Sequence, residues 1–148
     1  MSKADYSFFF PFRVRYSETD KQGIVFNAHY LTYFDTAIYE YCRTLPFDFQ
    51  EDLNQSGADF HTVHVDLDFQ APAGFDDEIE AHVKTIKMGR SSLKFEVAVY
   101  HKKGDAYLAK GSVVWVYVDQ NTHRATALPK HLVERLEARE GINLRSPH

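Results

Sequence analysis

The sequence predicts one α+β domain over residues 1–148, in which a long central helix is wrapped by a curved, largely antiparallel, five-stranded sheet. Two observations lead to this fold class. A strand-like alternation of apolar and polar residues runs into a long stretch with helical spacing, and four more strand-like stretches then follow with only short turns between them. Strands joined by short turns pair antiparallel, and a sheet with one apolar face needs a helix to cover it.

The first predicted strand covers residues 12–16, where Phe12, Val14 and Tyr16 alternate with polar residues. A helix follows, with Asn27 as its N-cap and Pro46 after its end. Its apolar positions recur every three or four residues, as expected for a helix buried over a broad face. These positions are Tyr30, Leu31, Phe34, Ala37, Ile38, Tyr41, Cys42 and Leu45.

Residues 47–57 are polar and turn-rich, with a short helical turn. The other four strands are predicted at residues 63–69, 79–83, 93–99 and 108–119, and a terminal helix at Lys130–Arg139 after Pro129. The last strand contains "VVWVYV", which is apolar on both faces. Because one face covers the core, the other needs a partner, and we expect a homodimer or a homotetramer.

Charge and cysteine content exclude several classes of protein. The formal net charge is −4, so no overall basic field is available for nucleic acid. Cys42 is the only cysteine, which leaves no internal disulfide and indicates a reducing compartment. The apolar burst at the N-terminus is too short for a signal peptide or a membrane span. We therefore predict a cytoplasmic protein without a membrane span.

Most catalytic signatures are missing. The chain has no G-x-S-x-G or G-x-G-x-x-G motif, and residues 104–112 do not fit a phosphate-binding loop. His61 and His64 are three residues apart on a predicted strand and point to opposite faces, and His64, Asp66 and Asp68 are typical of a polar strand face. We predict no metal site and no cofactor.

The stretch "YSETDKQGIVFNAHY" contains the strongest candidate for chemistry. Asp20, followed by Gly23, is compatible with an ordinary turn. The same turn leads into the start of the long helix, where free backbone N–H groups can polarise a carbonyl oxygen. A carboxylate beside such donors can attack an acyl carbon or activate water against it, so both interpretations of Asp20 stay open.

A second candidate is the turn in "KMGRSSLKF". Arg90, Ser91 and Ser92 offer a guanidinium, two hydroxyls and backbone donors, and the guanidinium matches the geometry of phosphate. A solvated hairpin turn is the plainer interpretation. Lys84, Lys87 and Lys94 lie close by in the sequence and favour an anionic ligand.

"RYSETDKQGIVFNAHYLTYFDTA" resembles the signature of the 4-hydroxybenzoyl-CoA thioesterase family, whose acyl-CoA thioesterases have the hotdog fold. "DFQAPAGFDDEI", "GRSSLKF" and "VDQNTHRATALP" resemble later segments of that family, so the likeness covers nearly the whole chain. The resemblance implies hydrolysis of an acyl-CoA or related thioester, with Asp20 as nucleophile or general base. It implies pocket and turn positions at Tyr16, Gly23, Val25, Asn27 and Tyr30, and contacts with the CoA phosphates at Arg90, Ser91 and Ser92.

Relatives of the acyl type often carry His, and those of the aryl type Tyr, where this chain has Asn27, so the acyl group stays open. Two alternatives remain. Hotdog dehydratases use a catalytic His with an acidic partner, a pattern that His29 and Glu40 do not reproduce. The other alternative is a non-catalytic protein that binds acyl-CoA or an acyl carrier, in which Asp20 is only a turn residue.

Overall fold

A computed structural model describes residues 2–145, without the side chains of Ile142 and Asn143. Its helices are α1 (His29–Thr44), α2 (Phe49–Ser56) and α3 (Lys130–Glu140), with short 3₁₀ helices η1 (Lys3–Asp5), η2 (Tyr16–Glu18) and η3 (Ile142–Arg145). Its strands are β1 (Phe8–Arg13), β2 (Ala58–Phe69), β3 (Glu78–Met88), β4 (Ser92–His101) and β5 (Tyr107–Asp119). None of the helices in this range is long and apolar enough to cross a membrane.

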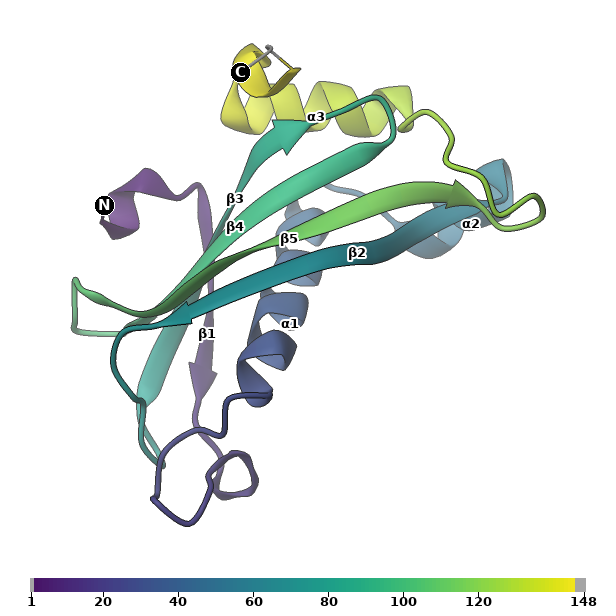
Figure 1. The fold of residues 1–148 in the computed structure, drawn as a ribbon. Helices are drawn as coiled ribbons and strands as arrows, with labels where there is room; N and C mark the ends of the chain where they lie inside the picture. Colours follow the sequence, from purple (N-terminus) through teal and green to yellow (C-terminus); the bar gives the residue numbers. More distant parts are fainter. Residues whose placement is uncertain (1, 146–148) are drawn as a thin grey trace. The chain divides into compact units, whose positions relative to one another are not determined.

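The five strands form one sheet in the order β1-β3-β4-β5-β2 (Figure 1). β1 runs antiparallel to β3, with Phe8 opposite Val83 and Arg13 opposite Glu78. The connections from β3 to β4 and from β4 to β5 are short, as neighbouring antiparallel strands allow. The predicted α+β class with a five-stranded antiparallel sheet is confirmed.

The chain divides into two compact units. The first unit comprises Met1–Tyr41, Leu67–Lys84 and Val97–Gly111, and the second comprises Cys42–Asp66, Thr85–Glu96 and Ser112–His148. Strands β2 to β5 each contribute residues to both units. One domain over residues 1–148 stays a prediction.

The core of the first unit is built around the apolar face of α1. Tyr33 lies 4.9 Å from Phe12 between ring centroids, and Tyr41 lies 5.9 Å from Phe8, so α1 packs on β1 through aromatic pairs. Each such buried ring stabilises the fold by roughly 1.5 to 3 kcal/mol. The prediction is wrong for Leu31, which is 45% exposed, and it missed Tyr33, which is buried. The other predicted positions of α1 in this unit are buried: Tyr30, Phe34, Ala37, Ile38 and Tyr41.

The core of the second unit centres on Trp115 of β5. Its ring lies 5.0 Å from Phe95, 5.3 Å from Phe60 and 5.9 Å from Phe49. Phe49 opens α2, a helix of eight residues where we predicted a single helical turn. The Asp48 side chain accepts the Glu51 N–H at the N-terminus of α2, and Gly57, with a φ of 72°, ends the helix. These are usual start and stop signals of a helix.

The prediction of a first strand over residues 12–16 is wrong in its bounds. β1 covers Phe8–Arg13, and Tyr16 starts η2 with 79% of its surface exposed. The reason is local. The Glu18 carboxylate accepts the backbone N–H of Arg15 at 2.8 Å, which closes a tight turn where the alternation suggests an extended chain.

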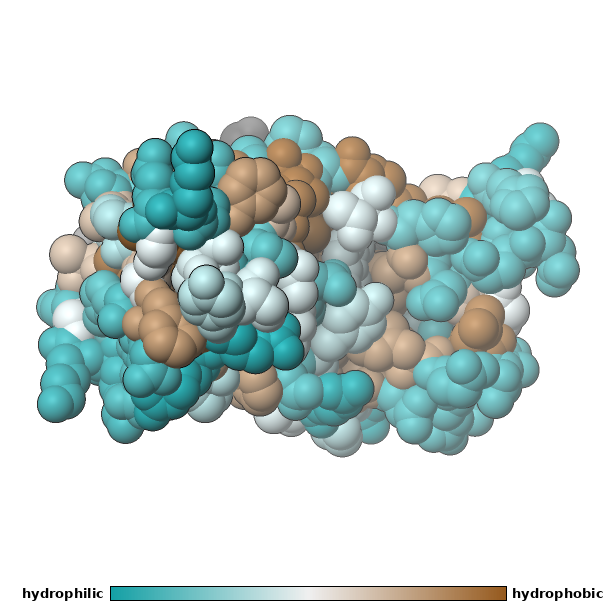
Figure 2. Space-filling view, turned by 90° about the horizontal axis from the view of Figure 1, so that it is seen from below, coloured by the Kyte–Doolittle hydropathy of each residue, from teal (hydrophilic) through white to brown (hydrophobic). Residues whose placement is uncertain are grey.

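Several large apolar side chains are exposed. Figure 2 shows hydrophobic residues at the surface between hydrophilic ones. On the edge strand β2, Val63 is 58% and Val65 38% exposed, so the predicted apolar face of this strand is not buried within the chain. On β5, Val113, Trp115 and Tyr117 are buried, whereas the alternate valines of "VVWVYV" are only half-buried.

Candidate functional site

Asp20 lies in a tight turn between η2 and α1, within the first unit. Its N–H donates to the Ile24 carbonyl at 2.9 Å, and its carbonyl accepts the Gly23 N–H at 2.9 Å. Gly23 has a φ of 78°, a conformation that favours glycine. The half-buried Asp20 carboxylate accepts the Gln22 N–H through Oδ1 at 2.8 Å. Its Oδ2 atom has no hydrogen-bond partner among residues 2–145.

Two free backbone donors precede α1. The N–H groups of His29, Tyr30 and Leu31 donate to the carbonyls of residues 26, 27 and 28. By contrast, the Asn27 and Ala28 N–H groups have no acceptor within the part of the chain that the structure describes. They therefore add to the partial positive charge that a helix carries at its N-terminus. α1 begins two residues after the predicted cap, Asn27.

A pocket of about 270 Å³ lies beside these donors. Three of the predicted site residues, Val25, Asn27 and Tyr30, line it, together with Ile24 and residues 69–72. No charged side chain contributes to this lining. The arrangement suits an uncharged group held next to backbone donors.

Tyr30 forms the buried wall of the pocket. Its side chain is 2% exposed, and its ring meets Phe69 edge to face at 5.3 Å between centroids. Burial raises the pKa of the Tyr30 hydroxyl, and a hydrogen bond with the backbone of Ala73 partly opposes the rise. Tyr30 is therefore a neutral phenol at physiological pH.

Glu18, which the sequence analysis did not single out, anchors the Asp20 turn. It is 6% exposed, and its Oε1 accepts the Arg15 N–H and the Tyr33 hydroxyl, each at 2.8 Å. Its Oε2 accepts the Arg15 guanidinium at 3.1 and 3.2 Å. Desolvation alone would raise the pKa of Glu18, but these hydrogen bonds together hold it below its usual value.

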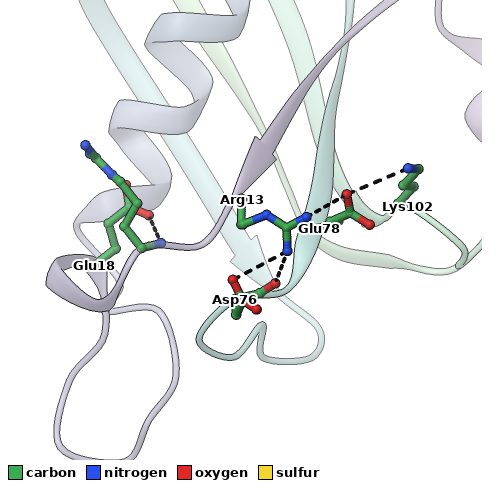
Figure 3. Close-up of polar contacts among 6 residues, drawn as sticks. Arg13, Glu18, Asp76, Glu78 and Lys102 are labelled. Atoms are coloured by element: carbon green, nitrogen blue, oxygen red, sulfur yellow. Dashed lines mark hydrogen bonds and ion pairs between the residues drawn. The ribbon is translucent and has the colours of Figure 1, made fainter.

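A second polar group fixes the loop that faces the Asp20 turn, at residues 70–77. Arg13 lies between Asp76 and Glu78, at 3.4 Å and 3.0 Å from their carboxylates, and Lys102 approaches Glu78 at 3.7 Å (Figure 3). Within the same loop, the Gly74 N–H donates to Asp77 Oδ2 at 2.7 Å. Gly74 in turn bridges to Ile24, which ties this loop to the Asp20 turn.

Tyr16 does not reach the pocket. Its exposed ring meets Phe75 edge to face at 5.8 Å between centroids. It is not among the residues that line the 270 Å³ pocket, although the resemblance implies a pocket position for it. A binding role for Tyr16 therefore stays a prediction.

The predicted turn at Arg90, Ser91 and Ser92 is found between β3 and β4, in the second unit. The Gly89 N–H donates to the Ser92 carbonyl at 2.9 Å, and the Arg90 and Ser91 carbonyls accept the N–H groups of Leu128 and Tyr117. The turn is thus fixed by its backbone. Arg90 is exposed, and its guanidinium has no ion-pair or hydrogen-bond partner among residues 2–145.

Other candidate groups do not assemble into a site. His61 contacts Gln120 at 3.1 Å, and His64 contacts Asp66 at 3.2 Å, both in the second unit. The described residues contain no group of three or more ligands that could hold a metal ion. His29 is half-buried against Phe26, at 6.2 Å between ring centroids.

Comparison with known proteins identifies the family. The family model of the thioesterase superfamily matches residues 22–107, which is more than half of the chain. "Acyl-CoA thioesterase YbgC" of Haemophilus influenzae is 30% identical over 128 residues, covering 86% of this chain and 93% of that protein.

Two solved structures have the same architecture. The PA5185 protein of Pseudomonas aeruginosa is 28% identical, with a TM-score of 0.83 over 93% of this chain and 94% of its own. Slr0204 of Synechocystis, a 1,4-dihydroxy-2-naphthoyl-CoA thioesterase, is 17% identical with a TM-score of 0.81, over 87% of this chain and 94% of its own, which is a likeness of fold alone. The chain has the hotdog fold and belongs to the thioesterase superfamily.

Proposed function

We propose that this protein hydrolyses acyl-CoA thioesters to a free acid and CoA. The observation that carries the proposal is the combination within one unit of the free Oδ2 of Asp20, the unpaired N–H groups of Asn27 and Ala28, and an uncharged pocket beside them. The similarity to an acyl-CoA thioesterase of Haemophilus influenzae over 86% of the chain supports it.

In the proposed mechanism the thioester oxygen accepts hydrogen bonds from the Asn27 and Ala28 N–H groups, which stabilise the negative charge of the tetrahedral intermediate. As a general base, Asp20 takes a proton from water, the water oxygen bonds to the acyl carbon, and the carbon–sulfur bond breaks. The departing thiolate then takes this proton from Asp20, which returns to the carboxylate form. As a nucleophile, the Asp20 carboxylate instead bonds to the acyl carbon, the carbon–sulfur bond breaks and the CoA thiolate leaves, which gives a mixed anhydride. Water then cleaves the anhydride to the free acid and the Asp20 carboxylate, and the proton that water loses goes to the thiolate. Neither route uses a metal or a cofactor.

Arg90, Ser91 and Ser92 are proposed to bind the phosphates of CoA. The exposed guanidinium of Arg90 forms no ion pair with an acidic side chain among residues 2–145, and three backbone hydrogen bonds hold the turn around it. A guanidinium on a fixed turn is pre-organised for phosphate oxygens.

The protein is proposed to act as a homodimer or homotetramer. β2 lies at the edge of the sheet with Val63 and Val65 exposed, and the outward valines of β5 are half-buried. An edge strand with apolar side chains on its surface is typical of an interface between copies.

A non-catalytic acyl-CoA or acyl-carrier binding protein is the second candidate. It is favoured by the hydrogen bond from the Gln22 N–H to Asp20 Oδ1, which is the bond that an aspartate in a purely structural turn makes. A hotdog dehydratase has less support, because His29 contacts no carboxylate among residues 2–145.

A thioesterase screen tests the proposal. The purified protein is incubated with aliphatic and aryl acyl-CoA esters and with acyl-carrier-protein thioesters, and free thiol is measured. Turnover of at least one CoA ester at or above about 1 s⁻¹ is expected, as for ordinary enzymes. Saturable binding of the same esters without thiol release favours the binding protein. Formation of an enoyl thioester from a 3-hydroxyacyl-CoA favours the dehydratase.

A further inference from the structure

The buried carboxylate of Glu18 has no role in the mechanism proposed above. A carboxylate that is 6% exposed loses most of its hydration, which is costly unless hydrogen bonds replace it. Its ion pair with Arg15 gives only a small return, because the Arg15 side chain is 75% exposed and solvent screens it. The ion pair with Arg15 therefore does not explain why a carboxylate is buried at this position.

Residues 15–26 form the catalytic segment, and the contacts of Glu18 connect both of its ends to α1. Its side chain binds Arg15 at the start of the segment and Tyr33 on α1. Its backbone carbonyl accepts the N–H of Phe26 at 2.9 Å, at the end of the segment. Asp20 lies two residues after Glu18, and the free N–H groups of Asn27 and Ala28 follow Phe26 directly.

We propose that Glu18 is the positioning residue that fixes the Asp20 carboxylate and the Asn27 and Ala28 donors relative to one another. It does not touch the substrate. It joins the two ends of the segment, at residues 15 and 26, to residue 33 of α1, so that the carboxylate and the two donors are held in fixed relative positions. This inference rests on the proposed function, since it concerns the reacting groups assigned there.

Only a carboxylate can make this set of contacts. Four donors converge on the two oxygens of Glu18: the Arg15 N–H, the Tyr33 hydroxyl and two guanidinium N–H groups. An ionised carboxylate is an acceptor at both oxygens, whereas an amide has one oxygen and a donor NH₂ group. Glu18→Gln has almost the same size but sets a donor against donors, so the segment loses its anchor without a change of volume.

The alternative is that Glu18 only stabilises the fold. The two roles differ in how Glu18→Gln combines with Asp20→Asn. If Glu18 acts by positioning Asp20, its substitution has little left to impair once the Asp20 carboxylate is gone. If Glu18 only supports the fold, it lowers the rate by the same factor with or without that carboxylate.

The experiment is a double-mutant cycle on the full chain. Glu18→Gln is expected to lower kcat by about tenfold to a hundredfold, as small misplacements of reacting groups do, with KM within about threefold of wild type. In an Asp20→Asn background the same substitution is expected to change the residual rate by less than about twofold. Glu51→Gln, which alters an exposed carboxylate of α2, is the control and is expected to leave kcat unchanged.

Two further measurements keep the test decisive. If Glu18→Gln does not fold, Tyr33→Phe removes one of the four donors and is expected to lower kcat by about threefold to tenfold. Amide hydrogen exchange needs no substrate: Glu18→Gln should speed the exchange of the Phe26 and Asp20 N–H groups and leave α3 unchanged.

Equal rate factors in both backgrounds would overturn the proposal, as would unaltered exchange at Phe26. A protein that cleaves no thioester contradicts the proposed function instead. In that case the exchange result still decides whether Glu18 holds the segment.

Discussion

The hydroxyl of Tyr33, on α1, donates a 2.8 Å hydrogen bond to Oε1 of Glu18, which lies fifteen residues earlier on η2. The link joins the first helical turns of α1 to the segment that carries Asp20. Desolvation and the nearby Glu18 charge raise the pKa of the Tyr33 hydroxyl above its ordinary value. The Tyr33 hydroxyl therefore stays protonated at physiological pH and can donate this hydrogen bond.

The first prediction concerns acid stability. The pKa of Glu18 is below its ordinary value of 4.5, so the carboxylate stabilises the fold fully above that value, and this contribution is lost as pH falls through the folded pKa. Glu18→Gln should cost about 1 to 3 kcal/mol at pH 7, and the difference from wild type should shrink below about pH 4. Urea denaturation at both pH values measures it. A constant difference would contradict the assigned cause.

The second prediction is that Asp20→Asn abolishes most of the activity. Asn keeps the size of the side chain and the acceptor for the Gln22 N–H, but it removes the anion. We expect kcat to fall by about two to four decades, with the fold and substrate binding close to native. Asp105→Asn, in an exposed turn of the same unit, is the matched control. A folded variant that retains more than about a tenth of native kcat would exclude the role.

The third prediction is that Arg90→Ala weakens substrate binding more than turnover. A charge-assisted hydrogen bond contributes roughly 1.5 to 3 kcal/mol, and less for an exposed group, so KM should rise about threefold to tenfold at low salt. The effect should shrink as salt rises. Lys103→Ala removes an exposed cation elsewhere and should leave KM unchanged. An equal response of the two variants would mean that Arg90 acts only through overall charge.

The fourth prediction is that the protein is at least a dimer. Light scattering at micromolar concentration should report two or four copies, because β2 presents Val63 and Val65 at an open sheet edge. Val65→Lys places a charge on that edge and should shift the population towards monomer. Asn54→Lys adds the same charge on the exposed face of α2, as a control. A wild-type monomer with full activity would rule the assembly out.

The fifth prediction concerns the second unit. The Tyr117 hydroxyl donates to the buried Asp52 carboxylate at 2.5 Å and lies 2.7 Å from the Ser56 hydroxyl. Burial, and then Asp52, raise the pKa of Tyr117 to about 12. Tyr117→Phe leaves the carboxylate without this donor and should cost about 1 to 3 kcal/mol.

Ser56→Ala keeps the Tyr117–Asp52 bond and should cost less than Tyr117→Phe. Because the folded pKa of Tyr117 is raised, its contribution should be constant up to the ordinary value of 10.0 and decline above it. Urea denaturation of both variants at pH 7 and at pH 11 makes the comparison. A cost that is the same at both pH values would contradict the link between Tyr117 and Asp52.

Regular apolar spacing made much of the fold predictable from the sequence. α1, β4, β5 and α3 lie within one or two residues of their predicted bounds, because their buried positions follow periods of 3.6 or 2. The alternation at Phe12, Val14 and Tyr16 predicted a strand that continues too far along the chain. The Glu18 carboxylate accepts the Arg15 N–H and closes a turn there. Periodicity carries no information about a side chain that captures a backbone N–H.

The site was predictable only in part. Val25, Asn27 and Tyr30 line one pocket, and Asp20, Gly23 and the start of α1 are close in sequence. The binding roles of these residues stay predictions. Glu18 gave no signal, because a glutamate beside a turn is ordinarily a solvated residue. Its burial depends on Tyr33, which arrives from a helix fifteen residues later, and sequence spacing does not reveal such a meeting.

The turn at Asp20 also restricts which acid can serve there. One carboxylate oxygen of Asp20 accepts the Gln22 N–H, two residues later in the chain. This hydrogen-bonded turn is typical of Asp and Asn, in which a single methylene separates the polar group from the backbone. Glutamate has nearly the same acidity but one more methylene, so it would give up the anchor and gain rotational freedom. At this position aspartate and glutamate therefore differ more in side-chain length than in proton affinity.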